Sequence, residues 1–180
     1  MTATWRAGAL RWLPTFLGFP IGGLVASLVA GPVDDVAAAL LGGAITGAVL
    51  GAVQARAMGT HGPPAGRWVA ATTAGLAAGV ALGSGAVGYG TSLGELVVQG
   101  AICGLVVGAT QALVLRGRAA YLWAPALSAL WALGWAVSTS IGIDVDTRWT
   151  GFGASGALVV TAATAVLPAL LATGTLRSSS

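Results

Sequence analysis

Long apolar stretches without a charged residue make up most of this sequence, and short polar segments separate them. Counted between charged residues, the stretches cover 12–33, 36–55, 68–94, 96–115, 119–143 and 149–176. A helix of about 20 apolar residues crosses the hydrocarbon core of a bilayer, since its backbone groups bond to one another. The pattern therefore predicts six transmembrane helices.

Glycine and proline between the stretches set the expected helix ends. We expect helices at about 12–30, 36–57, 67–87, 94–116, 120–141 and 152–174. A transmembrane β-barrel would need short strands of alternating hydrophobicity, whereas these runs are continuous and rich in Ala, Leu and Gly. The predicted fold class is therefore an all-α polytopic membrane protein.

The composition agrees with a chain that has lipid as its solvent. Hydrophobic residues make up 56% of the chain and charged residues 7%, and the mean hydropathy is +0.88, whereas an ordinary soluble domain is about a quarter charged. The eight basic residues are too scattered to form the clustered cationic surface that nucleic acid requires. We expect the lipid bilayer as the main partner and no nucleic acid.

The charges predict the orientation of the chain. If six helices alternate in direction, every arginine except Arg148 lies on the side of the two termini, and all the acids lie on the other side. Cytoplasmic loops are enriched in Arg and Lys, so both termini are expected in the cytoplasm of a cell membrane. Tryptophans near the predicted ends are interpreted as interfacial anchors: Trp5, Trp12, Trp68, Trp123 and Trp149.

Internal repeats suggest how the helices are grouped. The segment 43–55 returns with many identities at 100–112, and Trp12, Trp68 and Trp123 open the first, third and fifth predicted helices. The chain is therefore interpreted as one transmembrane domain of three parallel helical hairpins, with units of about 1–58, 59–117 and 118–180. A pseudo-threefold bundle is the simplest arrangement of such units. The third unit differs, because Phe152, Gly156, Val160 and Ala163 stand where the first has Gly43, Gly47, Gly51 and Gln54.

Glycines spaced by four or three residues lie on one face of three predicted helices. These helix-packing candidates are Gly43, Gly47, Gly51, Gly75, Gly79, Gly83, Gly100, Gly104 and Gly108. Such a ladder lets two helix backbones approach closely in lipid. Two interpretations stay open: packing within one chain, or an outward ladder that contacts a second copy or a partner membrane protein.

Gln54 and Gln111 lie on the glycine faces of the second and fourth helices. The simpler interpretation is a hydrogen bond between helices, which contributes about 0.5–2 kcal/mol. The alternative is a polar contact with a substrate, since intramembrane polar groups are often functional.

The carboxylates Asp35, Glu95 and Asp144 are candidates for an external cation contact. A hard cation needs oxygen ligands that converge, and the simpler interpretation is solvated loop charge. No metal site is predicted, because His61 and Cys103 are each the single residue of their type.

Catalytic groups are not evident in the sequence. No charged residue interrupts a predicted helix, and no Ser-His-Asp arrangement can be assembled. We therefore expect a non-enzymatic membrane scaffold or interaction component without a cofactor. The alternatives are a small channel or transporter for a solute or cation with an acidic external mouth, and a lipid or pigment pocket lined by Trp131 and Trp135.

The glycine ladder followed by Gln111-Ala-Leu-Val-Leu-Arg116, together with the segment from Trp68 through Ala71-Thr72 to Gly75, resembles a diffuse group of small bacterial multi-pass membrane proteins. Members of this group are generally uncharacterised. The resemblance implies a membrane location and transfers no activity or functional residue.

Overall fold

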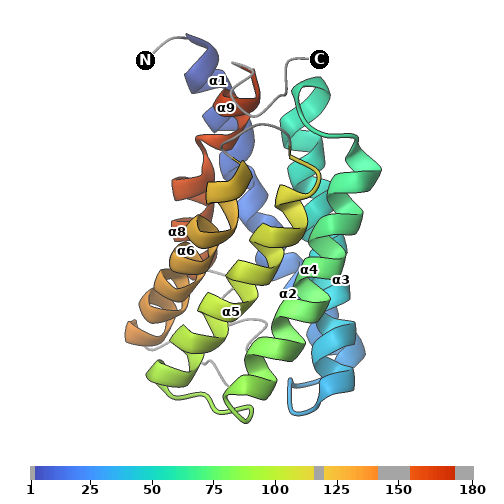
Figure 1. Ribbon diagram of the computed structural model, residues 1–180, viewed down its shortest axis with the longest axis vertical. Helices are drawn as coiled ribbons and strands as arrows, with labels where there is room; N and C mark the ends of the chain where they lie inside the picture. The colour runs from blue at the N-terminus through green and yellow to red at the C-terminus, as the bar shows by residue number, and fades with distance from the viewer. Residues whose placement is uncertain (1–2, 116–119, 142–154, 173–180) are drawn as a thin grey trace.

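The computed structural model describes residues 3–115, 120–141 and 155–172, and every regular element in these ranges is helical. The elements are α1 (Ala3–Trp12), η1 (Leu13–Leu17), α2 (Gly18–Ala30), α3 (Val36–Met58), η2 (Gly59–His61), α4 (Ala65–Ala86), α5 (Leu93–Ala112), α6 (Ala120–Ser140), α8 (Ser155–Thr164) and α9 (Leu167–Ala172). The all-α prediction is confirmed for this part of the chain (Figure 1).

Five helical stretches are long and apolar enough, by length and composition, to cross a membrane. Within the described ranges they are Ala7–Ala30, Val36–His61, Ala65–Ala86, Leu93–Ala112 and Ala120–Ser140. They correspond to the first five predicted helices.

The first stretch begins earlier than predicted, because helix α1 starts at Ala3 rather than near residue 12. The helix includes the basic residues Arg6 and Arg11, because a charged side chain does not interrupt helical hydrogen bonding. The turn at Pro14 is a 3₁₀ segment, η1. Proline has no N–H to bond to the carbonyl four residues earlier, so the helix tightens locally at this position.

The sixth predicted helix, at 152–174, is interrupted where the structure describes it. Helix α8 has 10 residues and α9 has 6, with a turn at Ala165 and Val166 between them. Pro168 accounts for the break, since it cannot donate to the carbonyl of Thr164 and its ring crowds that carbonyl.

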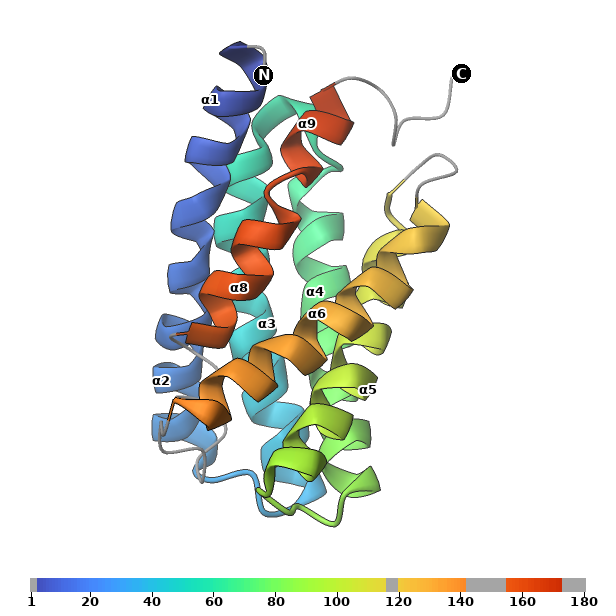
Figure 2. The ribbon, with the colours of Figure 1, turned by 90° about the vertical axis from the view of Figure 1, so that its left-hand side faces the viewer.

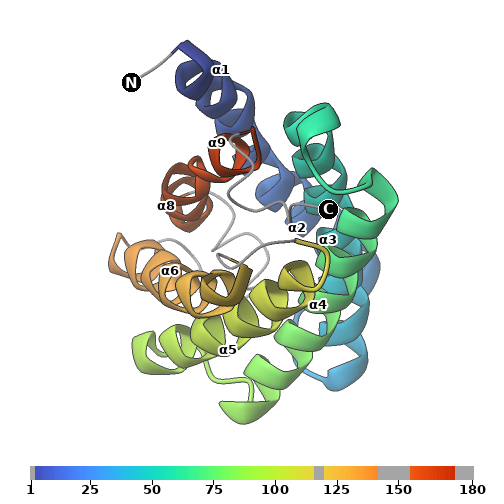
Figure 3. The ribbon, with the colours of Figure 1, turned by 45° about the horizontal axis from the view of Figure 1, so that its top comes forward.

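Consecutive helices pack side by side and alternate in direction. Contacts join α2 to α3, α3 to α4, α4 to α5, α5 to α6 and α6 to α8, and α8 and α9 return to η1 and α1. Figure 3 shows the resulting closed arrangement of helices around a common centre. We call the end that holds the start of α1 and the end of α9 the N-terminal end of the bundle, and the opposite end the far end.

The outer surface is apolar and the interior holds polar side chains, which is the reverse of a water-soluble bundle. Leu113 is 85% exposed, and Leu28, Leu122 and Tyr121 are also strongly exposed. Buried polar residues in the described ranges include Thr46, Thr72, Ser84, Gln99, Gln111, Ser138, Thr161 and Thr164. Both observations are compatible with a bundle that has lipid around it.

Candidate functional site

Gln111 is the centre of a buried hydrogen-bond network near the N-terminal end. Its side chain is 3% exposed and links three helices. The Nε2 group of Gln111 donates to Thr72 Oγ1 of α4 at 3.0 Å, and Gln111 Oε1 accepts from Trp123 Nε1 of α6 at 2.8 Å. Thr72 Oγ1 in turn donates to the carbonyl oxygen of Trp68 at 2.9 Å. Both the nitrogen and the oxygen of the Gln111 side-chain amide are therefore hydrogen-bonded.

Two further tryptophans bond to neighbouring helices in the same manner. Trp68 Nε1 donates to Gln54 Oε1 of α3 at 3.1 Å. Trp12 Nε1 donates to Thr164 Oγ1 of α8 at 3.1 Å, and that hydroxyl donates to the Val160 carbonyl oxygen at 2.8 Å. Each indole N–H thus finds an acceptor inside the bundle, as a buried donor must.

The interpretation of the tryptophans as interfacial anchors is wrong for Trp12 and Trp68. Trp12 is 1% exposed and Trp68 is fully buried, while Trp123 is partly buried. The N–H of each ring bonds to another helix instead of to lipid head groups. Trp149 lies outside the described residues, and nothing is described of the side chain of Trp5.

The network borders a central cavity of about 20 Å³. Its lining comes from α1, α2, α3, α5, α6 and α8 and includes Gln54, Gln111, Trp123 and Thr164. This volume holds about one water molecule. A lipid or pigment needs several hundred Å³, so the cavity that Trp131 lines is too small for one. Trp131 and Trp135 are instead buried in the core. The Trp131 ring packs edge-on against the Phe19 ring, with 5.7 Å between the ring centroids.

The predicted glycine ladders lie at contacts between consecutive helices, and all nine glycines are buried. Gly43, Gly47 and Gly51 of α3 face α4; Gly75, Gly79 and Gly83 of α4 face α5; Gly100, Gly104 and Gly108 of α5 face α6. A methyl group at Gly47 would lie 2.7 Å from the Thr73 Cα and 2.8 Å from the Thr72 carbonyl oxygen. The backbones therefore approach too closely for a larger residue.

The candidate carboxylates that the structure describes act at the starts of helices at the far end. Asp35 Oδ1 accepts from Ala38 N at 2.7 Å and caps α3. Glu95 Oε2 accepts from Ser92 N at 2.8 Å in a capping box that opens α5. The third candidate, Asp144, lies outside the described residues. Among the residues that are described, no group of three or more His, Cys, Asp or Glu side chains could hold a metal ion.

Thr164 and Gln99 are buried polar residues that sequence reasoning missed. Gln99 is 2% exposed, and its Oε1 has no hydrogen-bond partner among the described residues. Thr164 is one residue out of register with Gln54, which aligns with Ala163, so the repeat did not indicate a polar acceptor at this position.

The fold and the network define a class: an all-helical bundle with apolar helices compatible with an integral membrane protein. Comparison with known proteins finds no family, no curated protein and no solved structure that matches the chain.

Proposed function

We propose that this chain is a multi-pass membrane protein that crosses the bilayer six times and acts as a non-enzymatic membrane component with a closed centre. The observation that carries the proposal is the placement of hydrogen-bonded Gln, Thr and Trp side chains inside a bundle whose outside is leucine and valine. In water such a surface would be costly, because exposed apolar area raises the free energy and its burial lowers it. In lipid the same surface carries no such cost, because the acyl chains are as apolar as the leucine side chains.

The sixth crossing is supported by the direction of α8 and α9. In Figure 2 they follow one another from the lower half of the bundle toward the N-terminal end, and they contact η1 and α1. The interruption at Pro168 is tolerable within a membrane, because neighbouring helices and Ser or Thr side chains can satisfy the freed backbone groups. An even number of crossings follows, with both termini on one side.

Three hairpins are supported by the recurring tryptophan bonds. Trp68 bonds across α3 and α4, Trp123 across α5 and α6, and Trp12 across α1 and α8. Each bond joins the start of one predicted hairpin to the end of another. The acceptor is glutamine in two pairs and threonine in the third, in line with the divergence of the third unit.

The side of the membrane is inferred from the described charges. Arg6, Arg11, Arg56 and Arg67 belong to the N-terminal end, whereas Asp34, Asp35 and Glu95 belong to the far end. The positive-inside tendency then assigns the N-terminal end to the cytoplasm of a cell membrane.

The central cavity of about 20 Å³ favours a structural component over a channel. A pore would need a continuous water-filled path, and here Gln54, Gln111 and Thr164 bond to tryptophans instead of lining one. The glycine contacts favour packing within the chain. A partner membrane protein or a second copy would meet the outer apolar face.

The test is reconstitution of the purified chain in lipid vesicles that hold potassium and a small neutral sugar. We expect efflux no faster than from protein-free vesicles, with a pore-forming peptide as the positive control. Native mass spectrometry of the same preparation in mild detergent would report a second copy, a partner or a bound molecule. Protein-dependent efflux of either solute would contradict the closed centre and support the channel alternative.

A further inference from the structure

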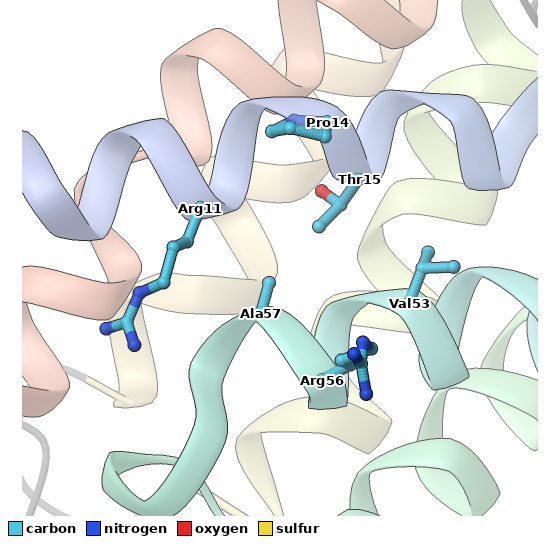
Figure 4. Close-up of a pocket in the computed structure, with 6 residues that line it drawn as sticks. All are labelled: Arg11, Pro14, Thr15, Val53, Arg56 and Ala57. Atoms are coloured by element: carbon cyan, nitrogen blue, oxygen red, sulfur yellow. The ribbon is translucent and has the colours of Figure 1, made fainter.

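A pocket of about 500 Å³ opens between the N-terminal helix and α3, away from the central cavity. Its lining is Arg11, Pro14, Thr15, Val53, Arg56 and Ala57. Figure 4 shows Arg11 and Arg56 reaching from the two helices on opposite sides of Ala57. The lining therefore includes two arginines and three apolar residues, and the volume is in the range of small-molecule sites.

Neither arginine is used by the fold. Arg11 and Arg56 are exposed and form no ion pair or side-chain hydrogen bond with any residue in 3–115, 120–141 or 155–172. The described carboxylates Asp34, Asp35 and Glu95 lie at the far end of the bundle. Two cations at one pocket, neither paired with a described carboxylate, favour an anionic ligand, and the planar guanidinium matches phosphate oxygens with paired hydrogen bonds.

Thr15 gives a second, independent indication. The residue is 3% exposed, and among the described residues its Oγ1 has no hydrogen-bond partner. Buried hydroxyl groups are bonded in most proteins, because an unmade bond costs free energy. The Oγ1 atom is itself covered, so a ligand oxygen in the pocket would bond to it after the Thr15 side chain turns about χ1.

We propose that this pocket binds the phosphate of an anionic phospholipid head group, which Arg11, Arg56 and Thr15 hold. The proposal rests on the membrane location proposed above. Arg11 lies in the first turns of the stretch Ala7–Ala30, and Arg56 lies in the last turns of Val36–His61, so both are at the depth of head groups. Leu10, Leu13 and Leu17 are exposed on the same segment and offer an apolar surface for the acyl chains. Basic pockets between transmembrane helices bind head groups by this chemistry.

The experiment is native mass spectrometry of the delipidated full chain in mild detergent, titrated with dioleoyl phosphatidylglycerol or dioleoyl phosphatidylcholine. We expect tighter binding of phosphatidylglycerol. Arg11→Gln and Arg56→Gln should each weaken that binding about fivefold, the effect of one cation near an anionic surface. Arg67→Gln is the matched control, since it removes an exposed arginine from the same end of the bundle without touching the pocket; its binding should change less than about twofold.

Thr15→Val keeps the shape of the side chain and removes the hydroxyl, and should weaken phosphatidylglycerol binding. Equal binding of the two lipids, or equal losses in the Arg11, Arg56 and Arg67 variants, would overturn the site. A parallel titration with glycerol 3-phosphate distinguishes the source of the phosphate: binding as tight as that of the lipid would overturn the lipid assignment. Because these titrations are done in detergent, their failure is separate from a failure of the proposed membrane topology.

Discussion

At the scale of single residues, the fold depends on a few polar side chains that serve more than one helix. Gln111 holds α4 and α6 to α5 through Thr72 and Trp123. Each such bond adds little to total stability, since the measured contribution of a hydrogen bond between helices in a membrane bundle averages about 0.6 kcal/mol. Their geometry is nonetheless specific, because an indole N–H without its acceptor would be left inside an apolar bundle.

The Gln111–Trp123 bond can be tested by a double-mutant cycle. Gln111→Leu should lower the free energy of unfolding by about 1–2 kcal/mol, because it strands two partners. Trp123→Phe should lower the free energy of unfolding less in the Gln111→Leu background than in the natural chain. The difference between the two losses, which is the coupling energy, should be about 0.5–1.5 kcal/mol. Reversible unfolding in mixed detergent micelles measures all four variants. Costs that add to within about 0.3 kcal/mol would show that the two side chains act independently.

At the same scale, the sequence placed Gln54 and Gln111 on the glycine faces but gave no means of choosing their partners. Tryptophan suits both a membrane interface and a buried donor site, so Trp12 and Trp68 were assigned to the wrong environment. The distinction depends on which helix lies opposite, and that is a property of the closed bundle. The Arg11 and Arg56 pocket was also beyond sequence reasoning, because the two residues come together only when α1 and α3 pack.

At the scale of the helices, close approach depends on glycine wherever one backbone lies on another. A methyl group at Gly75 would lie 2.9 Å from the Val107 Cα, whereas one at Gly85 in the same helix would meet nothing within 4 Å. The spacing of glycines in the sequence indicated a helix face. Proline effects were harder to predict: Pro14 leaves the first helix continuous in direction, while Pro168 separates α8 from α9.

Gly75→Ala and Gly85→Ala form a matched pair that tests this packing. Gly75→Ala should lower the free energy of unfolding by about 1–3 kcal/mol, because α4 and α5 must move apart. Gly85→Ala should be neutral or stabilising by up to about 1 kcal/mol, since alanine favours helix. Unfolding in mixed micelles, with circular dichroism as a check on helix content, compares them. Equal effects of the two substitutions would argue against the helix contact at Gly75.

At the scale of the whole molecule, the described part of the bundle has an apolar exterior, and its arginines and carboxylates lie at opposite ends. This separation is visible in the sequence once the helices are counted, because each helix takes the chain to the opposite end of the bundle. The closure of the bundle is not visible there, since it depends on contacts between α1 and α9 and between η1 and α8 that join distant segments.

The most direct test of the central claim is the accessibility of the two ends of the bundle from outside the cell. Gly66 and Gly94 are exposed glycines at the N-terminal end and the far end, and a side chain at either meets nothing within 4 Å. In a Cys103→Ala background, we predict that a membrane-impermeant maleimide labels the Gly94→Cys variant in intact cells and labels the Gly66→Cys variant only after permeabilisation. Labelling of the Gly66→Cys variant in intact cells would contradict the account.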